Sequence, residues 1–292
     1  MARMEYALAA PVMHALRWLP LPASNRLARA STRMLDVAVP KLRRVGLKNL
    51  SFAFPDLDER ERNRIIDGVF CSIARLLVSL ARFPSLNVSN ISKWISYQGL
   101  ENYCDAKKKG RGVLIATAHL GNWELSAFAH AILTEPMHVM VRPLDNPLID
   151  SLVESRRTRS GNHLILKKDG ARAVIKALRN NDPVGILIDQ NTGASEGVFV
   201  NFFGKLACAG SAFVKLAYHS KAPVVPGFAI WDEGAGRYVL RFYPEVQMSG
   251  DVVADTQRIH SVLEQIIRQY PDQWMWIHRR WKTRPPAEKP LY

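Results

Sequence analysis

Residues 112–124 read Gly112-Val113-Leu114-Ile115-Ala116-Thr117-Ala118-His119-Leu120-Gly121-Asn122-Trp123-Glu124. The apolar run 113–117 predicts a strand that leads His119 into a turn. Gly121 permits the turn, and Asn122 is a suitable N-cap for a helix over 123–133, where apolar residues recur at helical spacing. A strand that ends in a polar residue before a tight turn and a helix is where open α/β sheets carry their sites.

His119 and Glu124 together indicate a proton-transfer site. On one regular helix, five positions would turn the two side chains by about 500°, so they would diverge. With His119 before the turn and Glu124 inside the helix, they can meet. A carboxylate on one ring nitrogen leaves the other nitrogen as a base for a hydroxyl near neutral pH. We therefore predict that His119 is a general base oriented by Glu124, although this spacing also arises by chance.

The pattern after residue 112 alternates short apolar strands with helices. Such alternation predicts an α/β fold with a mixed, mostly parallel sheet covered by helices on both faces. We expect strands at 113–117, 138–141, 163–166, 184–188, 224–230 and 238–243, and helices near 123–133, 147–159, 170–180, 209–220 and 252–269.

The beginning of the chain has a different character. Residues 1–95 are predicted to form a helical, membrane-proximal region, and residues 96–292 the α/β core. A capping box at 56–59 starts a helix with one apolar stripe that ends near Phe83-Pro84. Residues 6–19 are apolar but too short and too interrupted to span a bilayer. They predict either a helix at the membrane surface with Trp18 at the interface, or an ordinary amphipathic helix docked on the domain.

The composition narrows the class of partner. With 40 basic and 26 acidic residues among 292, the net charge is +14. This excess implies an anionic lipid, a phosphorylated substrate, an acidic carrier protein or nucleic acid as partner. A hydrophobic content of 48% allows a sizeable core and excludes general disorder. Three cysteines without paired spacing indicate neither a disulfide framework nor a zinc site, and we expect no metal or cofactor.

Two further strand ends carry candidate site residues. Asp189 and Gln190 close the strand 184–188, so we expect them on the same rim as His119. The alternative is an aspartate that only forms a turn. Arg142 follows the strand 138–141 and precedes Pro143, which keeps it in extended backbone at a strand end. Its guanidinium group suits bidentate binding of phosphate.

At this point the residues carry a family resemblance. The segment 119–124 resembles the His-x4-Asp/Glu motif of the glycerolipid and lysophospholipid acyltransferase superfamily, and in detail the lipid A late acyltransferases of Gram-negative bacteria. The similarity continues, in the order of that family, over segments that span nearly the whole chain: 43–62, 141–143, 146–148, 167–170, 183–190, 197–205 and 271–285.

The resemblance implies an acyltransferase at the cytoplasmic face of the bacterial inner membrane, attached peripherally or at the interface. It would move a fatty acyl chain from acyl carrier protein to a hydroxyl of a lipid A precursor, with direct attack on the thioester. Arg142 and Arg159 would hold acceptor phosphates, and Asp189 and Gln190 would fix an acceptor sugar or a phosphate-binding arginine. The aromatic segment 197–205 would line an acyl channel, although it could equally be a core strand.

Two alternatives remain at this level. Related enzymes acylate phosphatidylinositol mannosides or other lipids with acyl-CoA, so another glycolipid and another donor are possible. A different class is a non-catalytic basic protein that binds anionic lipid or nucleic acid, which three tryptophans near Arg279 and Arg280 would favour. That reading leaves the segments 119–124 and 189–190 unexplained, and the tryptophans could instead close the core. We therefore expect no nucleic acid partner.

Overall fold

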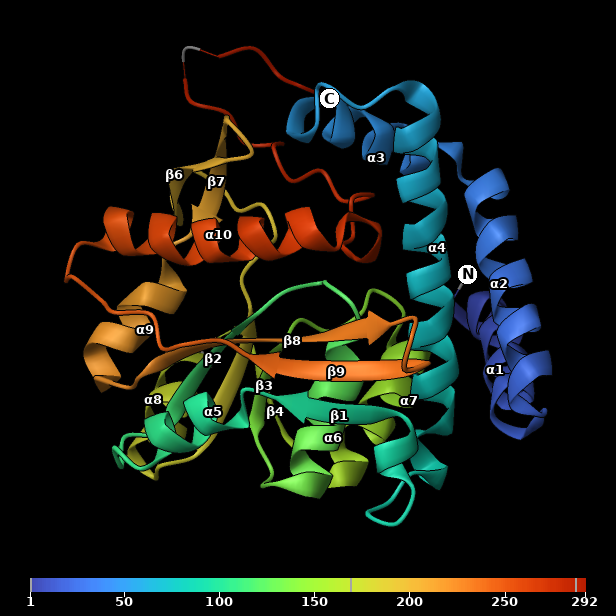
Figure 1. Ribbon diagram of the computed structural model, residues 1–292, viewed down its shortest axis with the longest axis horizontal. Coiled ribbons are helices and arrows are strands. Elements are labelled where there is room, and N and C mark those ends of the chain that lie inside the picture. The colour runs from blue at the N-terminus through green and yellow to red at the C-terminus, as the bar shows by residue number, and fades with distance from the viewer. Residues whose placement is uncertain (1, 169, 287) are drawn as a thin grey trace.

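The computed structural model describes residues 2–168, 170–286 and 288–292 (Figure 1). Its main sheet has seven strands in the order β1-β9-β8-β2-β5-β3-β4. The five strands from β8 to β4 are parallel, whereas β9 is antiparallel to β8 and carries β1 in parallel at the edge. In chain order they are β1 (Ile95–Gln98), β2 (Val113–Thr117), β3 (His138–Val141), β4 (His163–Leu166), β5 (Pro183–Leu187), β8 (Val224–Asp232) and β9 (Arg237–Phe242). The predicted mixed, mostly parallel sheet is confirmed.

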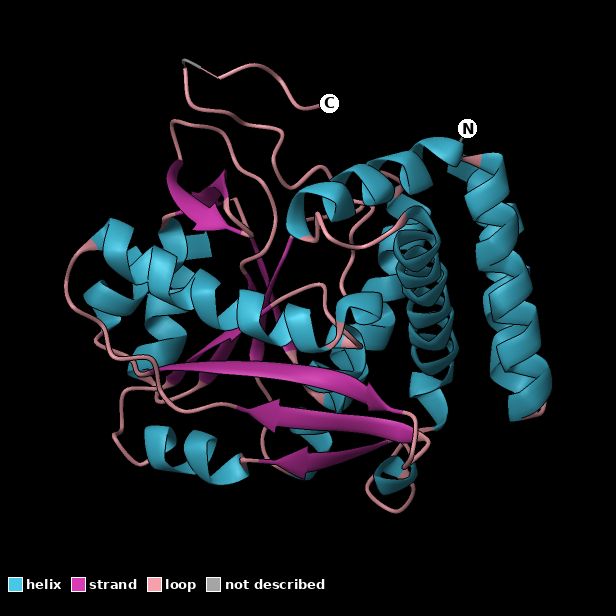
Figure 2. Ribbon diagram, turned by 45° about the horizontal axis from the view of Figure 1, so that its top comes forward, coloured by secondary structure: helices cyan, strands magenta, loops and turns pink. Residues whose placement is uncertain are grey.

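Helices cover both faces of this sheet (Figure 2). Because side chains alternate along a strand, Leu114 and Ala116 of β2 pack into one core, while Ile115 packs into the other. The first core includes α8 (Gly170–Arg179), α9 (Ala212–Ser220) and α10 (Val252–Gln269), and the second includes α5 (Leu100–Lys107), α6 (Trp123–Leu133) and α7 (Pro147–Arg157).

Four helices precede the sheet: α1 (Ala2–Trp18), α2 (Leu21–Ala38), α3 (Pro40–Ala53) and α4 (Glu59–Arg82). The long helix α4 runs beside the sheet, with α1 and α2 on its outer side (Figure 1). Its capping box joins Asp58 and Glu61, two residues later than predicted. The shift follows from a turn after α3, in which Leu57 N donates to Phe54 O. Within the described residues, no helix is both long and apolar enough to cross a bilayer.

The aromatic segment near residue 200 is a core hairpin. β6 (Gly197–Phe202) pairs antiparallel with β7 (Lys205–Gly210), and the pair lies above α10 in Figure 1. Phe202 and Phe203 are buried. The core-strand alternative is therefore correct for this segment, and the channel-loop alternative is wrong.

The aromatic and basic residues near the end of the chain are also buried. Trp274, Trp276 and Trp281 are at most 1% exposed, and Arg280 is fully buried with its Nη1 donating to Cys208 O. These tryptophans close the core around Phe202 and Phe203. They offer no exposed surface on which nucleic acid bases could stack.

Candidate active site

The turn that places His119 is built by two residues. Gly121 has φ of +63°, and a Cβ there would lie 1.9 Å from Ala229 O, so only glycine fits. Asn122 is fully buried and caps α6, because its Oδ1 accepts a hydrogen bond from Leu125 N at 3.0 Å. Its Nδ2 donates to Ser79 Oγ of α4 at 2.7 Å. The turn is thereby tied to β8 on one side and to α4 on the other, as a rigid site requires.

The carboxylate on the ring of His119 belongs to Asp189. Asp189 Oδ1 lies 2.9 Å from Nδ1 of the ring, and Oδ2 accepts hydrogen bonds from His119 N at 3.0 Å and Trp274 Nε1 at 2.8 Å. Strands β2 and β5 are parallel neighbours in register, with Thr117 opposite Leu187, so the two strand ends meet on one rim. The structure thus brings Asp189 to His119 from 70 residues away.

The predicted contact between Glu124 and the ring is therefore wrong. Glu124 instead accepts hydrogen bonds from Arg157 Nε at 2.8 Å and Arg157 Nη2 at 2.5 Å, and one from Trp123 Nε1 at 3.2 Å. The physical reason is the helix start: in the first turn of α6, Glu124 points toward α7, which carries Arg157. Glu124 still acts on His119 through space, since its charge favours the protonated ring.

The electrostatics define the protonation state of the pair. Burial alone would raise the pKa of Asp189, but His119 and the hydrogen bonds from Trp274 and from the His119 backbone outweigh it and lower the pKa to about 2. An ionised carboxylate only accepts, so Nδ1 of His119 carries the proton in the neutral ring, and Nε2 then keeps its lone pair. Burial lowers the pKa of His119, but the Asp189 charge more than offsets it and leaves that pKa above its ordinary value.

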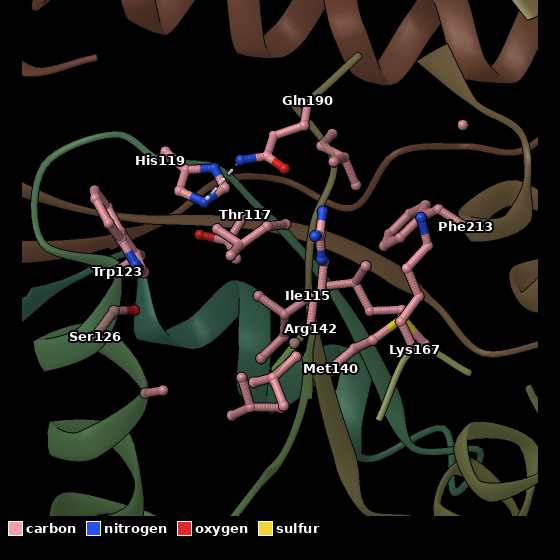
Figure 3. A pocket seen from close by; sticks show the side chains of 18 of the residues that line it. Ile115, Thr117, His119, Trp123, Ser126, Met140, Arg142, Lys167, Gln190 and Phe213 are labelled. Atoms are coloured by element: carbon pink, nitrogen blue, oxygen red, sulfur yellow. Dashed lines mark hydrogen bonds between the residues drawn. The ribbon is translucent and has the colours of Figure 1, made fainter. Parts of the chain in front are cut away.

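A cavity of about 740 Å³ opens beside the ring (Figure 3). It exists because β3 and β5 pair only at His138–Val184 and Val139–Gly185 and then diverge toward their carboxyl ends. Gln190 lies beside the ring, its Nε2 3.4 Å from His119 Nε2, and Arg142 extends into the same space (Figure 3). The apolar part of the wall comes from Ile115, Phe128, Met137, Val139, Val141, Leu187, Leu240 and Phe242.

The basic residues of the cavity differ in part from those expected. Arg142 lines it, and 78% of its side chain is exposed beside Asp145. Lys167 lines it as well, while residue 169 of the same motif lies outside the described residues. Among the described lining residues, Arg157 is present and Arg159 is not, because Arg159 sits exposed in the 3-10 turn that follows α7. The sequence signal for Arg157 is its spacing: it follows the apolar Val153 by four residues, which places both on the half-buried face of α7.

Two contributors were missed by sequence reasoning: Trp274, which donates to Asp189, and His278, whose Nε2 accepts from Asn191 N at 3.2 Å. Burial lowers the pKa of His278 to about 4, so it is neutral and able to accept. Their only sequence signal is the aromatic cluster itself. Among the described residues that line the cavity, none belongs to the segment 197–205. No group of three His, Cys, Asp or Glu side chains in the described ranges is arranged to hold a metal ion.

The fold and the cavity define an α/β protein with a carboxylate–imidazole pair at the mouth of a space suited to an alkyl chain. The chain belongs to the bacterial lipid A biosynthesis acyltransferase family, whose model matches residues 2–283. The resemblance seen in the sequence is confirmed, and the chain is an acyltransferase of lipid A biosynthesis. The alternative of a non-catalytic basic protein is wrong.

Several characterised relatives cover almost the same span. The chain is 30% identical to the lipid A biosynthesis palmitoleoyltransferase of Escherichia coli over 283 residues, covering 94% of this chain and 90% of that protein. The lauroyltransferase of the same organism is 30% identical over 277 residues, with the same coverage. A lipid A biosynthesis acyltransferase of Haemophilus influenzae is 27% identical over 275 residues, or 94% of this chain and 86% of that protein. The family implies an acyl donor and a lipid A precursor as acceptor.

Proposed function

We propose that the chain transfers a fatty acyl group from a carrier thioester to a hydroxyl of a lipid A precursor, with His119 as general base. The observation that carries this proposal is the 2.9 Å contact between Asp189 Oδ1 and His119 Nδ1, which in the neutral ring puts the lone pair on Nε2, beside the cavity. Asp189 takes the orienting role first predicted for Glu124, and Glu124 holds Arg157 at the cavity wall.

The reaction needs no covalent nucleophile from the protein. Nε2 of His119 takes the proton of the acceptor hydroxyl as the hydroxyl oxygen attacks the thioester carbonyl carbon. The carbon–sulfur bond then breaks, the sulfur leaves with the electron pair, and the imidazolium returns the proton to it. Asp189 stabilises the imidazolium between these two steps because its carboxylate stays ionised.

The lining of the cavity supports a proposed place for each of the two substrates. Its apolar wall between α6 and the sheet fits the acyl chain, since hydrocarbon gains free energy when it leaves water. Arg142 and Lys167 line the same cavity, and their charges fit the phosphates of a lipid A precursor. The net charge of +14 fits an acidic donor such as acyl carrier protein. Gln190 is proposed as a substrate contact. Arg157, which lines the cavity, is proposed as a substrate-binding arginine in place of Arg159.

We further propose that the protein binds peripherally to the cytoplasmic face of the inner membrane through α1 and α2. Met4, Leu8 and Trp18 of α1 are 65–75% exposed, as are Met34 and Val37 of α2 at 70% and 75%. Exposed apolar side chains among arginines favour the surface-helix alternative for this segment. The start of α1 also lies near the cavity mouth, because Asn146 Nδ2 donates to Ala2 O and to Glu5 Oε2.

The catalytic assignment is tested with purified protein, an acyl-carrier thioester and a lipid A precursor in detergent. We expect His119→Ala to lower kcat by about 10²- to 10⁴-fold, the usual contribution of a general base. The exposed His219→Ala serves as matched control and keeps full activity. Wild-type turnover by folded His119→Ala would overturn the assignment.

In the same assay, Arg142→Lys should raise the KM of the acceptor more than that of the donor, because lysine loses bidentate geometry.

A further inference from the structure

Residues 273–278, which we call the strap, bind both the His119 loop and the segment from Asp189 to Asn191. The strap follows the 3-10 turn Pro271–Gln273 and meets the His119 loop through an isolated antiparallel bridge between Leu120 and Trp274. Gly121 N donates to Gln273 O at 2.9 Å, and Met275 N donates to His119 O at 3.0 Å. The backbone that leaves His119 on its C-terminal side is thus bonded to the strap at two points, while His119 N donates to Asp189 Oδ2.

The strap also contacts the second half of the catalytic pair. Trp274 Nε1 donates to Asp189 Oδ2 at 2.8 Å, and His278 Nε2 accepts from Asn191 N at 3.2 Å. The segment from Asp189 to Asn191 is therefore bonded to the strap at both ends. A small displacement of the strap would move the carboxylate and the imidazole relative to each other.

One side chain from the N-terminal region anchors the strap. Asn49 of α3 is fully buried, and its Nδ2 donates to Trp276 O at 2.6 Å and to His278 O at 2.7 Å. Its Oδ1 accepts from Tyr292 Oη. The side-chain amide of Asn49 therefore donates two hydrogen bonds to carbonyl groups of the strap, 227 and 229 residues away in the chain.

Packing supports the strap but does not direct its carbonyl groups. Trp276 makes edge-to-face contacts with Phe54, Phe203 and Trp274, with ring centroids 5.8, 5.4 and 4.5 Å apart. Such contacts tolerate small rotations, whereas two hydrogen bonds from one planar amide fix both distance and direction. In the described part of the chain, the strap forms no ladder beyond the isolated bridge. The side chain of Gln273 fixes its start on Trp231, and the amide of Asn49 fixes the carbonyl groups at its other end.

We propose that Asn49 is a positioning residue for the acyl transfer: by holding the strap it keeps Asp189 and His119 in the geometry that proton transfer needs. This inference rests on the proposed roles of those two residues. Asn49 contacts neither of them directly and lies outside the cavity wall. Misplacement of catalytic groups by about 1 Å can cost on the order of 100-fold in rate, so the anchor matters for kcat and much less for binding of the acyl chain.

The test is Asn49→Asp, which keeps the size of the side chain and removes both donors. We expect kcat per folded molecule to fall by about 10- to 100-fold, with the KM of the donor within about twofold of wild type. We also expect the acidic limb of the rate profile to move to lower pH, since Asp189 raises the pKa of His119. Glu124 and Arg157, which also act on the ring, lie outside the strap and keep their places, and His278 of the strap stays neutral because burial lowers its pKa to about 4.

The matched control is Asn90→Asp, which also removes an amide that donates to a backbone carbonyl, that of Ser85, in a surface loop. It should leave kcat and the rate profile unchanged. If Asn49→Asp does not fold, Tyr292→Phe is used. It removes the hydroxyl that donates to Asn49 and accepts from Trp281 N, leaves both strap hydrogen bonds of Asn49 in place, and should lower kcat in the same direction by less.

Two outcomes overturn the inference. One is a folded Asn49→Asp or Tyr292→Phe protein with wild-type kcat and rate profile. The other is a loss of activity that only follows the folded fraction, with an unshifted acidic limb. His119→Ala, assayed in parallel, separates failure of this inference from failure of the proposed function. If His119→Ala is inactive and Asn49→Asp has wild-type activity, the role of Asn49 is disproved and the role of His119 as general base is retained.

Discussion

His119 depends on a single buried carboxylate for its protonation state. Asp189 is 3% exposed, yet its pKa falls to about 2 because His119, Trp274 and the His119 backbone all stabilise its charge. A buried charge is tolerated only when it is paired and hydrogen-bonded in this way. The consequence at residue scale is an imidazole with its proton on Nδ1 over the whole physiological range.

Asp189→Asn tests this coupling through pH. A general base works only when neutral, so the wild-type rate declines as pH falls through the raised pKa of His119. In the variant, the effects that lower this pKa remain, namely burial and Arg157, and the main effect that raises it is gone. We expect the acidic limb of kcat/KM to move to lower pH and the plateau to drop by about 10²- to 10⁴-fold.

A second histidine–aspartate pair serves as control for that experiment. His138 Nε2 lies 3.2 Å from Asp182 Oδ2, and both side chains are more exposed than the catalytic pair. Asp182→Asn should change neither the pH of the acidic limb of kcat/KM nor the height of its plateau. An Asp189→Asn profile that keeps its wild-type limb would show that another group sets the pKa of the base.

At the scale of elements, the start of α6 is the most constrained helix end in the site. The capping amide of Asn122 is fully buried and serves both Leu125 N and Ser79 Oγ. An N-cap contributes about 1 kcal/mol, and a buried group left without its partner costs about 1–3 kcal/mol. This end of α6 therefore links secondary structure, the packing of α4 and the position of His119.

Asn122→Ala should lower the free energy of unfolding by about 2–4 kcal/mol, because it removes the cap of α6 and also the buried hydrogen bond that Ser79 Oγ accepts, although Ser79 still donates to Leu76 O. Denaturant unfolding followed by circular dichroism measures this change. The comparison is Asp58→Ala at the exposed cap of α4, where the loss should stay near 1 kcal/mol. Equal losses in the two variants would contradict the special role of the buried cap.

For the molecule as a whole, charge and exposed apolar side chains act together. In the proposed mode of membrane binding, the net charge of +14 provides attraction to anionic lipid, and the exposed apolar side chains of α1 and α2 insert into the bilayer surface. The start of α1 is bonded to Asn146, four residues after Arg142. The helix proposed to bind the membrane is thereby joined to the segment that follows a lining residue of the cavity.

We expect Leu8→Ser combined with Trp18→Ser to weaken partitioning onto anionic vesicles by on the order of 10-fold, as buried apolar surface is lost. Raising the salt concentration should weaken the binding that remains, because screening acts on its electrostatic part. Val88→Ser removes a side chain that is 71% exposed elsewhere and is the control. Equal partitioning of the double variant and the wild type would exclude these two residues from membrane contact.

The sequence by itself determined what depends on neighbours along the chain. The strand 113–117, the cap at Asn122 and the helix over 123–133 all agree with the structure, because periodicity and capping are local effects. The edge strand Ile95–Gln98 was missed, since its apolar–polar alternation covers only four residues and carries too little signal. The helix expected from 209 begins at Ala212 because the residues before it complete the hairpin.

Only the tertiary structure decided which side chains meet. His119 pairs with Asp189 and not with Glu124, because β2 and β5 become parallel neighbours through a crossover that the local pattern does not encode. Arg157 reaches the cavity and Arg159 does not, since a 3-10 turn rotates the chain between them. Asn49 reaches the strap from the other end of the chain. Contacts over such distances depend on the packing of whole elements, and no spacing in the sequence records them.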